Sequence, residues 1–151
     1  MFGPCRGHIY RNMDDPHDLQ RFVDAQAPVI DRVCAELAQG RKRSHWMWFI
    51  FPQIAGLGFS AMAQRYAIRS LDEARAYLNH PILGPRLEDC TRLVLAVDGS
   101  TASDIFGWPD DMKFRSSMTL FAQAAPDRPV FAEALRKYFD DEPDPETLKR
   151  L

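Results

Sequence analysis

The residues best suited to chemistry begin with a basic and aromatic segment that reads GRKRSHWMWFIFPQ over residues 40–53. If Ser44 caps a short helix, the free N–H groups of Ser44 and His45, together with the ammonium group of Lys42, would suit a phosphate or a carboxylate. The indole rings of Trp46 and Trp48 could stack on a nucleobase or a nicotinamide-like ring. This segment therefore predicts a binding site for an anionic ligand that carries a flat ring.

Each of these residues also has a purely structural interpretation. Short aromatic helices usually fill a core, and a run of three basic residues is commonly solvated. His45 could act as a general acid or base near neutral pH, or it could be a hydrogen-bonded packing residue. The side-chain amide of Gln53, just beyond a helix-ending proline, could bind a ligand or hold a loop in place.

A second segment reads DIFGWPDDMKFRSSMTLF over residues 104–121 and combines carboxylates, a lysine and hydroxyl groups. If Asp110 caps a helix, Lys113 and Ser117 follow at helical spacing, and the three side chains project toward one side. As an N-cap, Asp110 should tolerate replacement by asparagine, because asparagine preserves the cap. The alternative to a binding site is an N-cap aspartate, an exposed lysine and a tight helix crossing that requires small residues.

The elements that must position these residues are helices. Apolar residues recur at intervals of three and four over residues 19–37, 83–97, 114–121 and 131–138. Pro28 interrupts the first stripe, which predicts either a kink or two abutting helices. Ser60, Ser70, Thr101 and Asp144 are placed to cap further helices. Because no segment shows sustained period-two alternation, we predict an all-α fold, an irregular orthogonal helical bundle.

The composition predicts a single folded domain. The chain has 151 residues, of which 46% are hydrophobic, and that is enough for one core. Residues 1–16 mix glycine, proline and charge without any period. We therefore expect a loosely ordered N-terminal extension over residues 1–16, followed by one helical domain over residues 17–151.

The composition also argues against several classes of function. With 19 Lys and Arg against 21 Asp and Glu, the net charge of −2 argues against a broad nucleic-acid-binding surface. No apolar run suits a membrane span or a signal peptide, which favours a cytoplasmic protein. The sequence contains no CxxC, HExxH or GxGxxG pattern and no Walker lysine. We expect a small-molecule ligand as the partner, with no metal, cofactor, membrane or nucleic acid, and the oligomeric state stays open.

Many residues of the two segments match a known family. The shared residues include HWMWF at 45–49, FPQ at 51–53, GLG at 56–58, FG at 106–107, Asp110, Lys113 and SMTLF at 117–121. On these residues the chain resembles the domain of unknown function 1810 family, from about residue 18 to residue 151. The resemblance implies a compact helical protein. Some members are labelled calpastatin-like, but calpastatin segments are extended and disordered, whereas this chain has the apolar content of a packed domain.

The chain is also similar, more faintly, to the NADAR superfamily of helical proteins, whose characterised members cleave N-glycosidic bonds. Ser44-His45-Trp46 is similar to a Glu-His-aromatic helix of that superfamily, and the DIFG sequence at residues 104–107 to an Asp-x-aromatic-Trp-Gly turn. Ser44 stands where that pattern has a glutamate. The resemblance therefore implies a nucleotide-like pocket in which Asp110 or Asp104 would supply the carboxylate.

The leading hypothesis is a pocket between residues 45–53 and 110–121 that binds a phosphorylated, nucleotide-like metabolite of the NAD or ADP-ribose type. Hydrolysis of an N-glycosidic bond is the reaction that this pocket would suit best. The alternatives are a non-catalytic nucleotide-binding module and a protein-interaction domain with an exposed aromatic patch. The candidate catalytic residues are Asp110, His45 and Asp104, and the candidate ligand-binding residues are Lys42, Ser44, Trp46, Trp48, Gln53, Trp108, Lys113 and Ser117.

The cysteines give the first testable prediction. Cys34 and Cys90 lie on apolar helix faces, where a cysteine behaves as a small hydrophobic residue, and neither they nor Cys5 belong to a disulfide pattern. Thiol titration of the denatured protein without reductant should therefore detect all three thiols. A lower count would reveal a disulfide bond.

Overall fold

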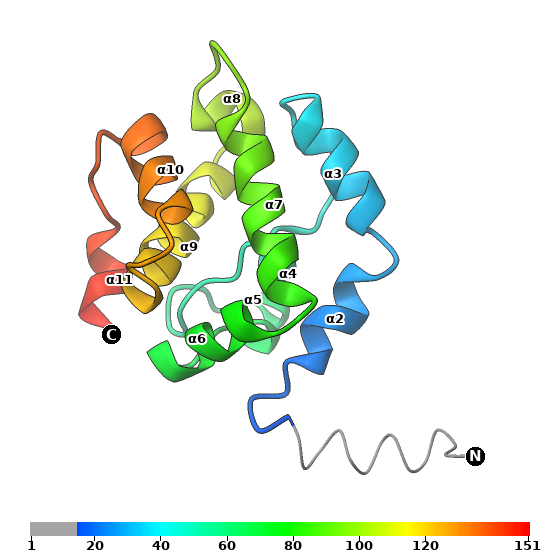
Figure 1. The fold of residues 1–151 in the computed structure, drawn as a ribbon, viewed down its shortest axis with the longest axis vertical. Helices are drawn as coiled ribbons and strands as arrows, with labels where there is room; N and C mark the ends of the chain where they lie inside the picture. The colour runs from blue at the N-terminus through cyan, green and yellow to red at the C-terminus, as the bar shows by residue number, and fades with distance from the viewer. Residues whose placement is uncertain (1–14) are drawn as a thin grey trace.

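The computed structural model describes residues 15–151, which form helices joined by loops and turns (Figure 1). The helices are α2 (Gln20–Gln26), α3 (Ile30–Ala38), α4 (Met47–Ile50), α5 (Ala61–Arg65), α6 (Leu71–Asn79), α7 (Leu83–Leu95), α8 (Ala102–Phe106), α9 (Asp110–Ala124), α10 (Val130–Phe139) and α11 (Pro145–Lys149). Within residues 15–151 the only β-type pairing is an isolated parallel bridge between Ile54 and Ile68. The predicted all-α fold is therefore confirmed.

The start of the described structure overlaps the predicted N-terminal extension by two residues. Residues 1–14 of that extension lie outside the described residues, while Asp15 and Pro16 lie within them. The carboxylate of Asp15 accepts hydrogen bonds from the backbone N–H groups of Leu19 and Gln20, at 2.7 and 2.9 Å. Asp15 thus satisfies backbone donors at the beginning of α2.

The predicted break at Pro28 separates two abutting helices. Helix α2 ends at Gln26, and α3 begins at Ile30 with Val29 in the cap position. The buried amide of Gln26 donates hydrogen bonds to the carbonyl oxygen of Phe49 and to the hydroxyl group of Tyr77, at 2.7 and 2.9 Å. This corner of the chain is therefore tied to both α4 and α6.

Four predicted N-caps are confirmed. The side chains of Ser60, Ser70, Thr101 and Asp144 each accept a hydrogen bond from the backbone N–H group three residues further on. Thr101 also forms a complete capping box with Asp104. These caps are local interactions, so the neighbouring sequence is sufficient to predict them.

Two other predicted caps are wrong. Ser44 precedes α4, whose cap position is occupied by Trp46, and the Ser44 hydroxyl group instead donates to the carboxylate of Glu36. Asp110 is the first residue of α9, and Pro109 occupies the cap position. In both cases a side chain from another element binds the polar group that was expected to cap the helix: Glu36 of α3 binds Ser44, and Lys42 binds Asp110.

Helix α9 passes through the middle of the core and contacts α6, α8, α10 and α11. Because neighbours surround it, its small polar residues Ser116, Ser117 and Thr119 are buried together with its apolar ones. Thr119 uses its hydroxyl group to donate to the carbonyl oxygen of Arg115, one turn earlier. Ser116 and Ser117, which belong to a candidate binding segment of the sequence, therefore take part in the close packing of α9.

Two further expectations concern cysteines and membranes. Cys34 and Cys90 are free thiols, while Cys5 lies outside the described residues. Burial, followed by the nearby Cys34 thiol, raises the pKa of the Cys90 thiol well above its usual range. Among the described helices, none combines the length and the apolar character needed to cross a membrane.

The packing of α6 against α7 depends on a residue without a side chain. A Cβ atom on Gly84 would lie only 2.0 Å from the carbonyl oxygen of Leu78. We expect Gly84→Ala to lower the free energy of unfolding by about 3 kcal/mol, because backbone must move to relieve the overlap. For a chain of this size, that loss corresponds to a decrease in melting temperature of about 10 °C.

The matched control is Gly99→Ala. Gly99 has a φ of +73° and no atom within 4 Å of the added Cβ, so only backbone strain of about 1 kcal/mol applies. Equal losses for the two variants in a thermal denaturation experiment would contradict the packing argument.

Candidate functional site

The segment between α3 and α4 is held by one buried carboxylate, that of Glu36 in α3. Its Oε1 atom accepts hydrogen bonds from the backbone N–H groups of Arg43 and Ser44, at 2.7 and 3.1 Å, and from the indole Nε1 of Trp46 at 2.9 Å. Its Oε2 atom accepts from the Ser44 hydroxyl group. The N–H group of Ser44, which we expected to bind a phosphate, is therefore already used within the protein.

These hydrogen bonds determine the charge state of Glu36. Burial by itself would raise the pKa of this carboxyl group. The hydrogen bonds from Ser44, Arg43 and Trp46 stabilise the ionised form more strongly and lower the pKa from 4.5 to about 2. Glu36 is thus an anion at neutral pH, and its charge organises the segment.

Lys42 joins this segment to α9. Its side chain is only 8% exposed, and its Nζ atom lies 2.8 Å from Oδ2 of Asp110. The same ammonium group lies 5.1 Å from the ring centroid of Trp46, which is 1% exposed. The Trp46 ring has no free face for a ligand, and the charge of Lys42 is paired inside the protein.

Asp110 bridges two lysines. Its second oxygen, Oδ1, lies 3.5 Å from Nζ of Lys113, whose side chain is 30% exposed. The Lys113 ammonium group also lies 5.6 Å from the ring centroid of Trp48. Replacing Asp110 by asparagine would leave the nearly buried ammonium of Lys42 without its charged partner, so the expectation that asparagine merely preserves a cap does not apply.

Two connected hollows lie beside these charges. The first, which we call the outer groove, has a volume of about 390 Å³ and separates the loop after α4 from α9 and α11. It is lined by Trp48, Gln53, Leu57, Gly58, Phe59, Ser60, Ala63, Pro109, Met112, Lys113, Ser116, Asp144 and Glu146. The elements that the sequence placed on either side of a pocket thus do line a common groove.

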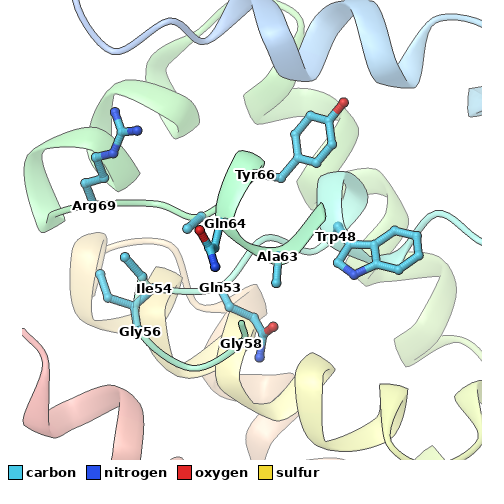
Figure 2. A pocket seen from close by; sticks show the side chains of 11 residues that line it. Trp48, Gln53, Ile54, Gly56, Gly58, Ala63, Gln64, Tyr66 and Arg69 are labelled. Carbon is cyan, nitrogen blue, oxygen red and sulfur yellow. The ribbon is translucent and has the colours of Figure 1, made fainter. Parts of the chain in front are cut away.

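The second hollow, which we call the inner cavity, has a volume of about 140 Å³ and is shown in Figure 2. It is lined by Trp48, Gln53, Ile54, Ala55, Gly56, Gly58, Ala63, Gln64, Tyr66, Ala67 and Arg69. Trp48, Gln53, Gly58 and Ala63 line both hollows. The two hollows therefore form adjoining parts of one site.

The loop and α5 approach each other closely at this junction. A Cβ atom on Gly58 would lie 2.8 Å from the Cβ atom of Ala63. The absence of a side chain at Gly58 therefore allows the loop to pass next to α5. The isolated bridge between Ile54 and Ile68 holds the same loop on its other side, with the Ala55 N–H group donating to the carbonyl oxygen of Ile68 at 2.8 Å.

Two side-chain amides, those of Gln53 and Gln64, line the inner cavity and lie between Trp48 and Arg69 in the view of Figure 2. The Nε2 atom of Gln64 donates to the carbonyl oxygen of Phe59 at 2.7 Å. The half-buried amide of Gln53, in contrast, forms no hydrogen bond with any residue in the described part of the chain. Gln53 therefore has both donor and acceptor capacity available for a ligand.

The structure brings three of the candidate residues together. Trp48, Gln53 and Lys113 all line the outer groove, and Trp48 and Gln53 reach the inner cavity as well. Trp108 is 81% exposed and directly precedes the groove residue Pro109. These residues come from segments that are distant in sequence, and the fold makes them neighbours.

The other candidates lie elsewhere. Ser117 is fully buried, and its hydroxyl group has no hydrogen-bond partner among residues 15–151. His45 and Asp104 are exposed. The lining of the two hollows includes none of His45, Asp104 and Asp110. The Asp104 carboxylate accepts from the backbone N–H group of Thr101 and so stabilises the start of α8.

Sequence reasoning missed several residues that form or support the site. Glu36 belongs to an amphipathic stripe that gave no sign of its role, and Gln64, Tyr66 and Arg69 lie in an unremarkable polar stretch. Asp144 was predicted only as a helix cap, yet it also lines the outer groove. Its position before Pro145 signals the cap but not the groove, because the groove requires α11 to pack near α9.

Residues 15–151 define a class of protein. It is a helical bundle with a two-part hollow beside a cluster formed by Lys42, Asp110 and Lys113. No group of three or more His, Cys, Asp or Glu side chains within residues 15–151 is placed to hold a metal ion. The chain belongs to the family described as "Protein of unknown function (DUF1810)", whose sequence profile matches residues 16–151. The predicted resemblance to this family is therefore confirmed.

A solved structure supports the same relationship. The chain is similar to the conserved hypothetical protein Rv1873 from Mycobacterium tuberculosis, with 55% sequence identity and a TM-score of 0.90. The similarity covers 91% of this chain and 98% of that chain. A comparison with curated proteins found no match.

The role of Glu36 leads to a stability prediction. Glutamine cannot accept hydrogen bonds from all the donors around this position, so Glu36→Gln should lower the free energy of unfolding by about 2–3 kcal/mol at pH 7. Because the folded-state pKa of Glu36 is about 2 and lies below its usual 4.5, the carboxylate stabilises the protein above pH 4.5. That stabilisation should be lost progressively as the pH falls from 4.5 toward 2.

Urea denaturation of the parent and the variant at pH 7 and pH 3 measures this effect. The difference between them should shrink at pH 3, where the unfolded state takes up a proton at this group. Glu133→Gln, which changes an exposed glutamate, is the control and should alter stability by less than about 0.5 kcal/mol. A difference that is independent of pH would contradict the assigned role of the Glu36 charge.

Proposed function

We propose that the outer groove and the inner cavity together bind a small phosphorylated metabolite that carries a flat ring. The observation that carries the proposal is the position of Trp48, a half-buried indole that lines both hollows with the Lys113 ammonium group 5.6 Å from its ring. An aromatic face next to a cation suits a ligand that combines a ring with an anionic group. Gln53 adds hydrogen-bonding groups at the same junction.

The charges support a single phosphate contact on this side of the groove. Lys42, Asp110 and Lys113 carry a net charge of +1 in total, and Lys42 is nearly buried. Lys113 lines the groove and is the more exposed of the two lysines. We therefore assign phosphate binding to Lys113 and a positioning role to Lys42 and Asp110.

Hydrolysis of an N-glycosidic bond is a second candidate, and Asp144 is the observation that favours it. Its Oδ2 atom accepts hydrogen bonds from the Ser116 hydroxyl group at 2.8 Å and from the Thr147 hydroxyl group at 2.6 Å. A firmly held carboxylate at the groove could stabilise positive charge on a sugar ring. In this version of the hypothesis, Asp144 takes the role that the sequence suggested for Asp110 or Asp104.

A protein-interaction surface is the competing function. Phe59, Trp108 and Met112 are 83%, 81% and 42% exposed, and two of them line the outer groove. Exposed aromatic residues of this kind are common at interfaces. The metabolite proposal does not need Trp108, so Trp108→Ala should leave the affinity for a small ligand unchanged.

Calorimetric titration with ADP-ribose, adenosine 5′-monophosphate and uridine 5′-monophosphate tests the proposal. For a ligand that binds, Lys113→Ala should weaken the affinity about tenfold, because a charge-assisted contact is lost. Trp48→Leu should weaken it by a similar factor, because stacking is worth about 1–3 kcal/mol per base. Arg92→Ala removes an exposed cation from α7 and is the matched control, with no change expected.

Either of two results would overturn the proposal. If no phosphorylated ring compound binds, or if Lys113→Ala binds as tightly as the parent, the groove is not a phosphate site. Capture of a protein partner that Trp108→Ala abolishes would then favour the interaction surface.

A further inference from the structure

Resting on the proposed function, we infer that the inner cavity receives a single six-membered ring with an amide-like edge, as in a pyrimidine base or a pyridine carboxamide, and that Gln53 recognises that edge. The inference adds a selectivity to the proposed site: a nucleotide with a one-ring base should bind better than one with a purine. It depends on the size, the walls and the polar groups of the inner cavity.

The inner cavity is small. Its volume is about 140 Å³. An engineered cavity of about 150 Å³ in another protein is known to hold one benzene molecule. The inner cavity therefore fits one six-membered ring, whereas a purine has a second fused ring that must remain outside or displace a wall.

The walls are suited to a flat ring. The lining includes the aromatic side chains of Trp48 and Tyr66 and the apolar side chains of Ile54, Ala63 and Ala67. In Figure 2 the hydroxyl group of Tyr66 points away from Gln53. That hydroxyl group accepts a hydrogen bond from Nε of Arg65 at 3.3 Å. A ring in the cavity would thus meet mainly apolar and aromatic surface.

Two side-chain amides, those of Gln53 and Gln64, offer polar contacts in the inner cavity, and Gln53 is the one with no hydrogen-bond partner among residues 15–151. The guanidinium group of Arg69 points away from Gln53 in Figure 2, and Nε2 of Gln64 is already bonded to the Phe59 carbonyl oxygen. The Gln53 amide offers a donor and an acceptor side by side. Such a group pairs with a ligand edge that presents an acceptor beside a donor, as a lactam, a carboxamide or the amino edge of adenine does, so the preference for one ring rests on the size of the cavity.

The connection between the hollows sets the orientation of the ligand. Trp48, Gln53, Gly58 and Ala63 line both hollows, while Lys113 lines only the outer groove. A ligand with its ring in the inner cavity can therefore extend its phosphate into the outer groove toward Lys113. A nucleoside monophosphate with a one-ring base has this arrangement of parts.

Four probes test the inference by calorimetry: uridine 5′-monophosphate, nicotinamide mononucleotide, adenosine 5′-monophosphate and ribose 5-phosphate. At least one of the two one-ring nucleotides should bind tenfold or more tightly than the adenine nucleotide, and comparison of the two identifies the base or the carboxamide as the preferred edge. Ribose 5-phosphate, which has no ring base, should bind more weakly than the preferred nucleotide.

Two variants separate the ring contact from the phosphate contact. Ala67 lines the inner cavity but not the outer groove, so Ala67→Leu should fill the cavity and reduce the affinity of the preferred nucleotide to that of ribose 5-phosphate. Gln53→Leu approximately keeps the volume but removes the amide, and it should weaken the preferred nucleotide about tenfold, a larger factor than for ribose 5-phosphate. Ala55→Val, at another residue of the inner cavity alone, replaces Ala67→Leu if the latter does not fold.

The outcomes distinguish this inference from the proposal beneath it. If the adenine nucleotide binds as tightly as the one-ring nucleotides, or if the cavity-filling variant binds them normally, the ring assignment is wrong while the phosphate site stands. If none of the four probes binds, this inference is wrong, and if ADP-ribose does not bind either, the proposed function is wrong as well.

Discussion

The carboxylate of Glu36 makes the contacts on which the geometry of the site depends most. It emerges from α3 and accepts hydrogen bonds from two successive backbone N–H groups, a hydroxyl group and an indole of residues 43–46. A buried anion with this many donors is stable only when all of them are present, because an unsatisfied buried charge is costly. Together with the hydrogen bond from the Lys42 N–H group to the carbonyl oxygen of Ile105 at 2.7 Å, this carboxylate directs the chain into α4 and so toward the position of Trp48.

The link from this segment to α9 is also ionic. Lys42 lies between the Trp46 ring and the Asp110 carboxylate, and Asp110 in turn reaches Lys113 at the edge of the outer groove. Two successive charge pairs thus run from a nearly buried lysine to a partly exposed one. Because both pairs share Asp110, the position of Lys113 is coupled to the segment that Glu36 holds.

The two hollows lie beside this ionic framework rather than within it. Their walls come mainly from the loop after α4 and from α5, which carry small residues, aromatic rings and the amide of Gln53, for which residues 15–151 supply no hydrogen-bond partner. A rigid charged framework next to a loop with available hydrogen-bonding groups is an arrangement that suits binding sites. The similarity to Rv1873 at 55% identity gives a second protein in which the same residues can be tested.

The sequence alone determined the helical fold, the break at Pro28 and the starts of α5, α6, α8 and α11, and only the tertiary structure decided which candidate residues form the site. Caps such as Ser60 and Thr101 and the break at Pro28 depend on neighbours within a few residues, so local stereochemistry was enough to predict them. Ser44 and Asp110 looked like caps by the same local rule, but a carboxylate from α3 and a lysine from another segment bind them instead. A hydrogen bond or ion pair between distant residues leaves no periodic signal in the sequence, because it depends on how the helices pack.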